Sequence, residues 1–402
     1  MSRRATLWAM VAVLLLAAAL RLAEFGRLPP GLYHDEAYHG LDAATVLAGD
    51  RPLYFPANNG REPLFIYLVA GAVGVLGRSP FALRLPALFA GLLTVAATGA
   101  LGNALFSRRV GVLAAAVLAV TLWHVHLSRI GFRAVLLPLF TALTLWQGAR
   151  AGLPHRRRAI TGALLAGLFY GLTFYTYTAA RFTPVALAVY AALLARRRRS
   201  LTVRAAPLLA AVAAALLTLL PLAVYTVLHP QEVLGRPGQV FVWNAAISHG
   251  DPWGLLAHNL LATLGMFFWR GDRIWRHNVP WRPVFDPLLG LMFLLGLLVA
   301  LRRARRSPAA LLLIVWTAVM SLPTVLAEDA PHFLRAVGLL PLIALLPALG
   351  LDWVMGWAGG GGADTRSVLT RVGIVAFVLL VGLLSTAWAY FGDYARNPMT
   401  GY

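Results

Sequence analysis

Apolar segments long enough to cross a bilayer recur along this chain, and they restrict its fold more than any other feature. Hydrophobic residues make up 59% of the chain, charged residues 12%, and the mean hydropathy is +0.72. A soluble fold cannot cover that much apolar surface. We therefore predict an all-α polytopic membrane protein with about eleven transmembrane helices, near residues 5–23, 82–105, 110–127, 134–149, 159–177, 183–195, 205–227, 286–301, 308–327, 334–356 and 369–391.

The distribution of arginine orients these helices, because positive charge concentrates in cytoplasmic loops. The apolar piece 63–77 is short for a crossing and suits a juxtamembrane helix. If it does not cross, the dense basic clusters become cytoplasmic: Arg108 with Arg109, Arg150 with Arg156–Arg158, Arg196–Arg199, and Arg302–Arg306. We expect a multi-pass protein of the inner (plasma) membrane whose single domain spans 1–402. Outer loops then cover 24–81 and 229–285, and no soluble C-terminal domain follows.

The net charge of +20 invites a nucleic-acid function, but its placement argues against one. All 35 basic residues are arginine, and the positive excess falls in short cytoplasmic loops that face anionic lipid. We expect the lipid bilayer, and no nucleic acid, as a partner. Cysteine is absent, which excludes disulfides, a thiol nucleophile and a cysteine-ligated metal.

The stretch 31–42 in the first outer loop concentrates acid–base chemistry in a chain that has few carboxylates. Asp35 and Glu36 stand side by side there, flanked by His34 and Tyr38. Adjacent carboxylates just beyond a membrane face are candidates for general acid–base catalysis. An alternative and compatible role for Asp35 is the N-cap of a short helix over 36–47, since a carboxylate satisfies free backbone N–H groups.

Arginines at the outer lipid boundary are not explained by the positive-inside rule and need partners. Four of them lie in separate outer loops: Arg129, Arg133, Arg181 and Arg335. Guanidinium groups suit bidentate contacts to phosphate, so we expect the set to bind an anionic donor. The alternative for each arginine is a lipid headgroup or a carboxylate such as Glu62 or Glu328.

Further polar side chains fall at the same outer face and are expected to contact substrate. They are His34, Tyr38, Arg61, Glu62, Tyr175, Tyr177 and His332. A divalent metal cation stays an open alternative. If one is bound, His34, Asp35, Glu36 and His39 offer suitable atoms, but two histidines five residues apart do not make a closed site.

Several of these stretches together resemble the GT-C membrane glycosyltransferases. They are Tyr-His-Asp-Glu-Ala-Tyr (33–38), Arg-Glu-Pro-Leu-Phe-Ile-Tyr (61–67), Phe-Ala-Leu-Arg-Leu-Pro (81–86) and His-Phe-Leu-Arg (332–335). The group that they resemble is glycosyltransferase family 39 and its relatives, with the protein O-mannosyltransferases and the lipid A aminoarabinose transferase. The resemblance implies that Asp35 is catalytic, with Glu36 beside it. It also implies a polyprenyl-phosphate-linked sugar whose phosphate is held by basic residues. Many relatives carry a second Asp where this chain has Gly131.

The sequence and the resemblance together predict an inverting membrane glycosyltransferase. We expect it to move a hexosyl or pentosyl group from a polyprenyl-phosphate donor to an acceptor protein, lipid or glycan. The reaction would take place on the non-cytoplasmic face, with Asp35 as general base. One alternative is a transporter or flippase of a lipid-linked anion, although such proteins usually place ionisable groups at mid-membrane. An inactive membrane scaffold is another alternative.

Overall fold

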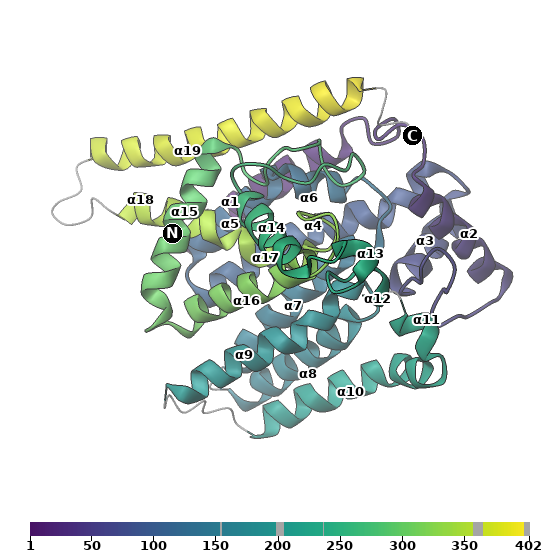
Figure 1. Cartoon of the computed structure of the whole chain (residues 1–402). Coiled ribbons are helices and arrows are strands. Elements are labelled where there is room, and N and C mark those ends of the chain that lie inside the picture. The colour runs from purple at the N-terminus through teal and green to yellow at the C-terminus, as the bar shows by residue number, and fades with distance from the viewer. Residues whose placement is uncertain (153–154, 198–204, 236, 357–364, 398–402) are drawn as a thin grey trace.

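Long helices, joined by short turns and two longer loops, make up this chain (Figure 1). The computed structural model describes residues 1–152, 155–197, 205–235, 237–356 and 365–397. Within these ranges, extended pairing is limited to two isolated β-bridges. The predicted all-α polytopic architecture is confirmed.

Each predicted span corresponds to one helix or to helices that follow one another directly. They are α1 (Arg3–Leu22), α4 (Pro80–Leu105), α5 (Arg108–Val120) with α6 (Leu122–Leu127), η1 (Arg133–Val135) with α7 (Leu136–Ala151), α8 (Arg156–Thr173), η2 (Thr178–Phe182) with α9 (Thr183–Arg196), α10 (Ala205–Leu228), α15 (Pro287–Ala304), α16 (Pro308–Val325), η3 (Val337–Leu339) with α17 (Leu340–Ile343) and α18 (Leu345–Gly356), and α19 (Thr365–Ala387) with η4 (Trp388–Tyr394). Arg198 and Arg199 of one predicted cytoplasmic cluster lie outside the described residues.

Within the described residues, eight of these helical stretches are long and apolar enough to cross a membrane on their own. The predicted spans 110–127, 134–149 and 159–177 are helical but fall short of that standard for local reasons. The first is divided because Thr121 takes an extended conformation between α5 and α6. Helix α7 has 16 residues, and the first turn of α8 carries three arginines. All three nevertheless pack against neighbouring helices: α5 against α4, α7 against α4 and α8, and α8 against α10.

Small residues allow helices of the bundle to approach closely. A Cβ on Gly296 of α15 would lie 1.7 Å from the Leu346 carbonyl oxygen of α18, and one on Gly350 would lie 2.2 Å from the Met292 carbonyl oxygen. Only glycine permits this backbone contact, which is typical of helix packing in membranes. The contact holds α18 in the centre of the bundle, where residues 345–351 are all buried.

The first outer loop contains two short helices, α2 (His34–Ala48) and α3 (Leu64–Leu76), where the sequence predicted juxtamembrane helices. They pack against each other, and α3 also packs against α4, at one end of the bundle (Figure 1). Helix α3 has 13 residues, shorter than a bilayer crossing needs. This loop therefore folds onto the bundle and carries the conspicuous carboxylates with it.

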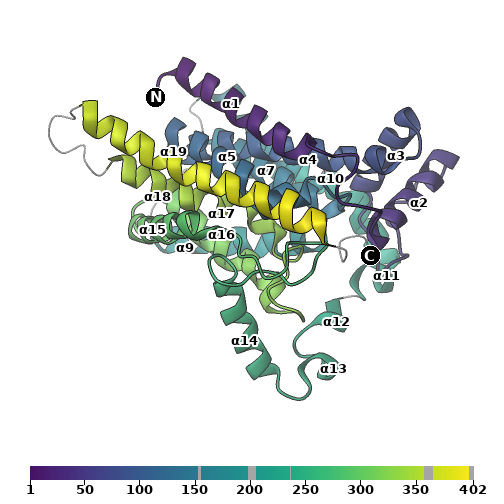
Figure 2. The same cartoon turned by 90° about the horizontal axis from the view of Figure 1, so that it is seen from above.

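The second outer loop carries four short helices: α11 (Pro230–Leu234), α12 (Pro237–Val240), α13 (Ala245–Ser248) and α14 (Pro252–Gly265). Figure 2 shows α13 and α14 projecting away from the bundle. After α14 the chain returns, and Val284 and Phe285 donate backbone hydrogen bonds to Met266 and Phe267. Residues 266–286 are thereby held against the bundle, next to the segment that follows α16.

Candidate active site

Glu36, not Asp35, caps the N-terminus of α2. The helix begins at His34, and the backbone N–H of Tyr33 donates to Glu36 Oε2 over 3.1 Å. The predicted N-cap role of Asp35 is wrong, because the helix starts two residues earlier than the prediction placed it. Asp35 instead lies in the first turn, where the helix dipole favours a negative charge. This leaves its carboxylate available for contacts outside the helix.

The Asp35 carboxylate is half-buried and accepts a hydrogen bond of 2.8 Å from Nδ2 of Asn58. Burial opposes its ionisation, but the Asn58 hydrogen bond and the positive charges of Arg276 and Arg133 outweigh burial and lower its pKa. Asp35 is therefore a carboxylate at neutral pH. It can accept a proton or pair with a cation.

His39 lies one helical turn after Asp35 and lines the same small cavity, of about 20 Å³, beside Arg133 and Tyr177. Its Nδ1 donates to the Gly131 carbonyl oxygen over 2.8 Å when that nitrogen carries the proton. Burial and the Arg133 charge lower its pKa to about 3, so the ring is neutral at pH 7. Its Nε2 is buried and has no hydrogen-bond partner among the described residues. A cavity of this size holds about one water-sized group.

Glu36 points away from that cavity and is fully buried. Arg84 of α4 donates to both carboxylate oxygens, from Nε to Oε1 and from Nη2 to Oε2, each over 2.8 Å. The Gly131 N–H donates to Oε1 over 2.7 Å, in addition to the Tyr33 N–H on Oε2. Both oxygens are thus occupied. The geometry makes Glu36 a positioning residue that ties α2 to α4, and offers no opening for the catalytic role expected from the sequence.

Three of the four predicted phosphate-binding arginines converge on one cavity of about 190 Å³. Arg133, Arg181 and Arg335 all line it, together with Tyr54, Asn59, Tyr177 and apolar side chains. Arg133 also pairs with Glu62 over 2.7 Å, Arg181 donates to the Val233 carbonyl over 2.9 Å, and Arg335 pairs with Glu328. Each arginine is held by a neighbour while it faces the cavity. The carboxylate partners expected as alternatives for Arg133 and Arg335 are therefore present, and both arginines still line the cavity.

Arg129 does not line that cavity, so the structure gives the predicted phosphate contact of this arginine no support. Its side chain is fully buried, and its guanidinium donates to the carbonyl oxygens of Leu20, Arg21 and Ala23 at the end of α1. The last carbonyls of a helix lack intrahelical partners, and Arg129 satisfies them. The ring of Tyr390 packs over the guanidinium at 4.7 Å. Arg129 is thus a structural cap.

The remaining predicted contact residues divide between the site and its surroundings. Tyr177 lines the cavity with Arg133, and Glu62, which pairs with Arg133, lines a second cavity with Tyr177 and Arg181. Arg61 is buried, pairs with Asp42 over 2.5 Å and lies over the Tyr38 ring. His34 is exposed and packs edge-on against that same ring. Arg61 thus contacts two residues of α2, Tyr38 and Asp42.

Tyr175 lies apart from the other predicted contact residues. Its hydroxyl donates to the Thr218 carbonyl oxygen and accepts from the Leu222 N–H, which fastens it to α10. Both hydroxyl contacts are thus made within the helical bundle. The structure does not bring Tyr175 to the cavity that Arg133 lines.

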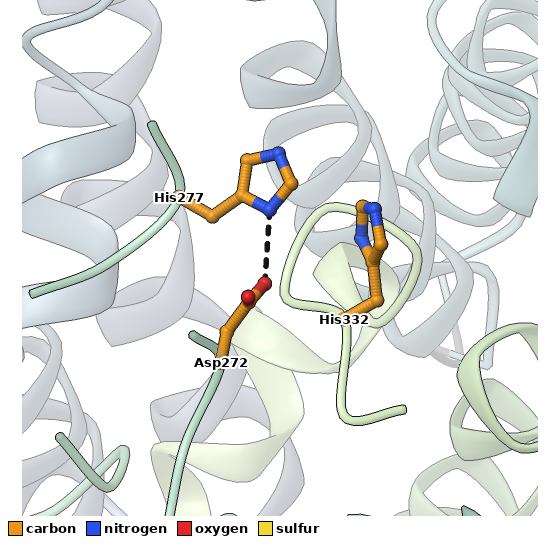
Figure 3. A group of neighbouring side chains, drawn as sticks. All are labelled: Asp272, His277 and His332. Carbon is orange, nitrogen blue, oxygen red and sulfur yellow. Dashed lines mark hydrogen bonds and ion pairs between the residues drawn. The ribbon is translucent and has the colours of Figure 1, made fainter. Parts of the chain in front are cut away.

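Of the predicted metal ligands, Asp35 and His39 line one cavity, but Glu36 is bound by Arg84 and His34 packs on Tyr38. Among the described residues, metal-ligating side chains instead gather at Asp272, His277 and His332 (Figure 3). Sequence reasoning singled out only His332 of these three. The other two carry no local signal, because their meeting with His332 depends on how distant loops pack.

Sequence reasoning also missed Arg276, and it noted His39 only as a possible metal ligand and Asn58 only as part of a polar stretch. Helical spacing places His39 on the same face as Asp35, because residues four apart lie on one helix face. Asn58 stands in an Asn-Asn-Gly turn, which predicts a turn but not the direction of the side chain. Arg276 belongs to the second outer loop, and nothing in its neighbours points to Asp35.

Known proteins share the fold of this chain. Residues 56–225 match the model of the family described as dolichyl-phosphate-mannose-protein mannosyltransferase. The apo oligosaccharyltransferase of Archaeoglobus fulgidus is 18% identical, with a TM-score of 0.62 over 98% of this chain and 56% of that chain. ArnT from Cupriavidus metallidurans, bound to undecaprenyl phosphate, is 15% identical, with a TM-score of 0.61 over 100% of this chain and 74% of that chain. No curated protein matches the sequence significantly.

These matches confirm the resemblance to GT-C glycosyltransferases on which the sequence motifs converge. At identities this low, the structural likeness shows the fold. The chain spans little more than half the length of the archaeal protein that it matches.

Proposed function

We propose that this chain, which has the GT-C fold, is a membrane glycosyltransferase that takes its sugar from a polyprenyl-phosphate-linked donor. One observation carries the proposal. The cavity at the ionised Asp35 and the cavity of Arg133, Arg181 and Arg335 share two lining residues, Arg133 and Tyr177. A base and a set of cations therefore meet at one point, as sugar transfer from a phosphate requires.

The donor's chemistry suits the larger cavity, which has two kinds of lining. Cationic side chains gather with apolar ones, among them Phe182, Val240, Phe241, Pro323 and Leu326. A phosphate with a hydrocarbon chain combines the same two properties. In support, ArnT is described as bound to undecaprenyl phosphate, and the Archaeoglobus fulgidus oligosaccharyltransferase AglB is described in complex with an inhibitory peptide and a dolichol-phosphate.

The proposed reaction is a single displacement. Asp35 takes the proton from the acceptor hydroxyl or amine as that group attacks the anomeric carbon. The bond between the anomeric carbon and the phosphate oxygen breaks, and its electron pair leaves with polyprenyl phosphate. Attack opposite the departing phosphate inverts the anomeric carbon. Arg133, Arg181 and Arg335 stabilise the negative charge that grows on the phosphate.

The location of the site follows from the same proposal. Asp35 lies in the loop that the arginine distribution places on the non-cytoplasmic side of the inner (plasma) membrane. A lipid-linked donor suits that side, because its phosphate and sugar can stand at the membrane surface while its chain stays in the bilayer. The acceptor is a hydroxyl or amine of a protein, lipid or glycan.

The test is transfer by the purified protein in lipid nanodiscs. Each candidate polyprenyl-phosphate sugar is supplied with a membrane extract as acceptor, and mass spectrometry follows donor consumption and product mass. We expect one donor to be consumed by the wild type. Asp35→Asn should fold normally and lose about two to four orders of magnitude in rate.

Asp50→Asn is the matched control, since Asp50 is an exposed carboxylate of the same loop, at the far end of α2. It should retain the wild-type rate. A folded Asp35→Asn protein with near-normal transfer would overturn the assignment of the base. A wild-type protein that moves intact lipid-linked donor across vesicles without cleaving it would overturn sugar transfer.

A further inference from the structure

Three buried ligand-type side chains from two outer segments meet beside the bundle. Asp272 and His277 belong to the segment that returns after α14, and His332 belongs to the segment after α16 (Figure 3). Their relative exposures are 1%, 2% and 8%, so they are shielded from solvent. One ligand atom from each lies within 4.8 Å of those of the other two.

We propose that Asp272, His277 and His332 form a site for a divalent transition-metal cation, with Zn²⁺ as the preferred ion. Two imidazoles and one carboxylate are a donor set that zinc accepts, and three protein ligands leave one position for water or a substrate group. The chain has no cysteine, so nitrogen and oxygen are its available strong ligands. This inference does not rest on the proposed sugar transfer.

The distances require little movement of the ligands. His277 Nδ1 and Asp272 Oδ2 are 2.9 Å apart, and the two imidazole ring centres are 4.5 Å apart. In a tetrahedral site with bonds of about 2.0 Å, neighbouring ligand atoms are separated by about 3.3 Å. An ion can thus bind between Asp272 and His277 if these two side chains move slightly apart. The His332 ring lies beside them, as Figure 3 shows, and supplies the third ligand atom.

Backbone contacts hold the carboxylate in place before any ion binds. The Ile274 N–H donates to Asp272 Oδ1 over 2.8 Å, and the Phe333 N–H donates to Oδ2 over 2.7 Å. The second bond joins the two segments and brings the residue before Phe333, which is His332, next to Asp272. Such outer contacts orient metal ligands and strengthen binding.

Binding requires one rearrangement. Arg276 Nε donates to His277 Nε2 over 3.0 Å, which leaves the ring proton on Nδ1, facing Asp272. An ion on Nδ1 needs the proton on Nε2, so Arg276 must turn away from the ring. Arg276 is exposed and its side chain makes no other hydrogen bond within the described part of the chain, so the side chain can turn away.

Ion binding would fix the segment that carries Arg335, three residues after His332. Arg335 lines the cavity with Arg133 and Arg181. The metal would therefore join the second outer loop to the segment that contributes Arg335 to that cavity. The assignment is tested by binding, which does not depend on activity.

The experiment uses the full chain with a non-histidine affinity tag, treated with chelator and then dialysed. Co²⁺ is the first probe, because a nitrogen- and oxygen-ligated tetrahedral site gives visible absorption bands. We expect saturable bands, about one ion bound per chain by elemental analysis, and displacement of the bands by Zn²⁺. The thermal midpoint should rise with Zn²⁺.

His277→Gln and His332→Gln should lose the bands and weaken Zn²⁺ binding by about 10-fold or more. His258→Gln on α14 is the control, because His258 is exposed and outside the cluster. It should bind like the wild type. Size-exclusion profiles and chelator-treated midpoints establish that the variants are folded. Absence of saturable Co²⁺ bands in the wild type, or unchanged binding in folded His277→Gln and His332→Gln, would overturn the proposal.

Discussion

Asn58 donates a hydrogen bond of 2.8 Å to Asp35 Oδ1 from a turn in which three successive residues have positive φ. The φ angles of Asn58, Asn59 and Gly60 are 49°, 66° and 77°. Asparagine tolerates this left-handed region better than most residues. Glycine is required at position 60, because a Cβ there would lie 2.2 Å from the Tyr54 hydroxyl oxygen. The turn thus serves to aim Asn58 at the proposed base.

Replacing Asn58 by glycine keeps a left-handed backbone and removes only the hydrogen bond. The pKa of Asp35 should rise, because burial disfavours the ionised carboxylate and the Asn58 hydrogen bond is the largest of the contacts that favour it. A base must be deprotonated, so the acid limb of the kcat/KM profile should move to higher pH. Activity would then be lost earlier as pH falls. A profile that coincides with the wild type would show that Asn58 does not tune Asp35.

Glu36→Gln tests whether Glu36 holds the fold or acts on substrate. Removing one partner of a buried pair leaves the Arg84 charge uncompensated, at a cost of about 3–5 kcal/mol of unfolding free energy. Asp352→Asn is the control, since its partner Arg109 has a side chain 38% exposed. That change should cost about 1 kcal/mol or less. Denaturant titration in detergent measures both. A Glu36→Gln protein that is stable yet inactive would restore the catalytic role.

Arg335→Ala should weaken the donor step. Loss of a charged hydrogen bond of about 2 kcal/mol corresponds to a fall of about 30-fold in kcat/KM for the donor. Arg181→Ala should act in the same direction. Arg273→Ala is the comparison, because Arg273 is exposed in its pair with Asp329 and does not line the cavity. Unchanged donor kinetics in both Arg335→Ala and Arg181→Ala would show that these arginines do not bind the donor and only contact Glu328 and Val233.

Arg129→Ala should behave differently from the cavity variants. Its guanidinium satisfies carbonyls at the end of α1, so its loss should lower the thermal midpoint and the yield of folded protein. Donor KM of the folded fraction should stay near the wild-type value. A stable Arg129→Ala protein with a raised donor KM would return Arg129 to the phosphate site.

Single cysteines test the sidedness of the loops, since the chain has no native thiol. Ala57 and Ser107 are both exposed, one in the first outer loop and the other at the start of α5. Ala57→Cys should react with an impermeant thiol reagent from outside intact cells. Ser107→Cys should react only after the membrane is opened. Labelling of both from the same side would contradict the eleven-helix topology.

The helices and the position of Asp35 could be predicted from the sequence because they depend on local properties. Apolar length decides which segments cross, and short polar turns decide where helices end. Most predicted spans match helices of the structure closely. The resemblance of short motifs to a known family then indicated which outer loop carries the candidate base, namely the first.

The separate roles of neighbouring charged residues were decided only by tertiary structure. Asp35 and Glu36 are adjacent, but successive residues of a helix point in directions about 100° apart. One therefore faces a cavity and the other faces Arg84. Arg129 and Arg133 lie in the short stretch from α6 to η1, yet they contact different partners, the end of α1 and Glu62.

Contacts between distant loops lay beyond sequence reasoning altogether. Asp272 and His332 are 60 residues apart, and the hydrogen bond from the Phe333 N–H to the Asp272 carboxylate is one of the contacts that hold them side by side. Hydrophobic pattern places helices, but it does not determine which polar groups meet where the helices end. Those meetings depend on the packing of the whole bundle, since buried charges and imidazoles are placed where partners satisfy them.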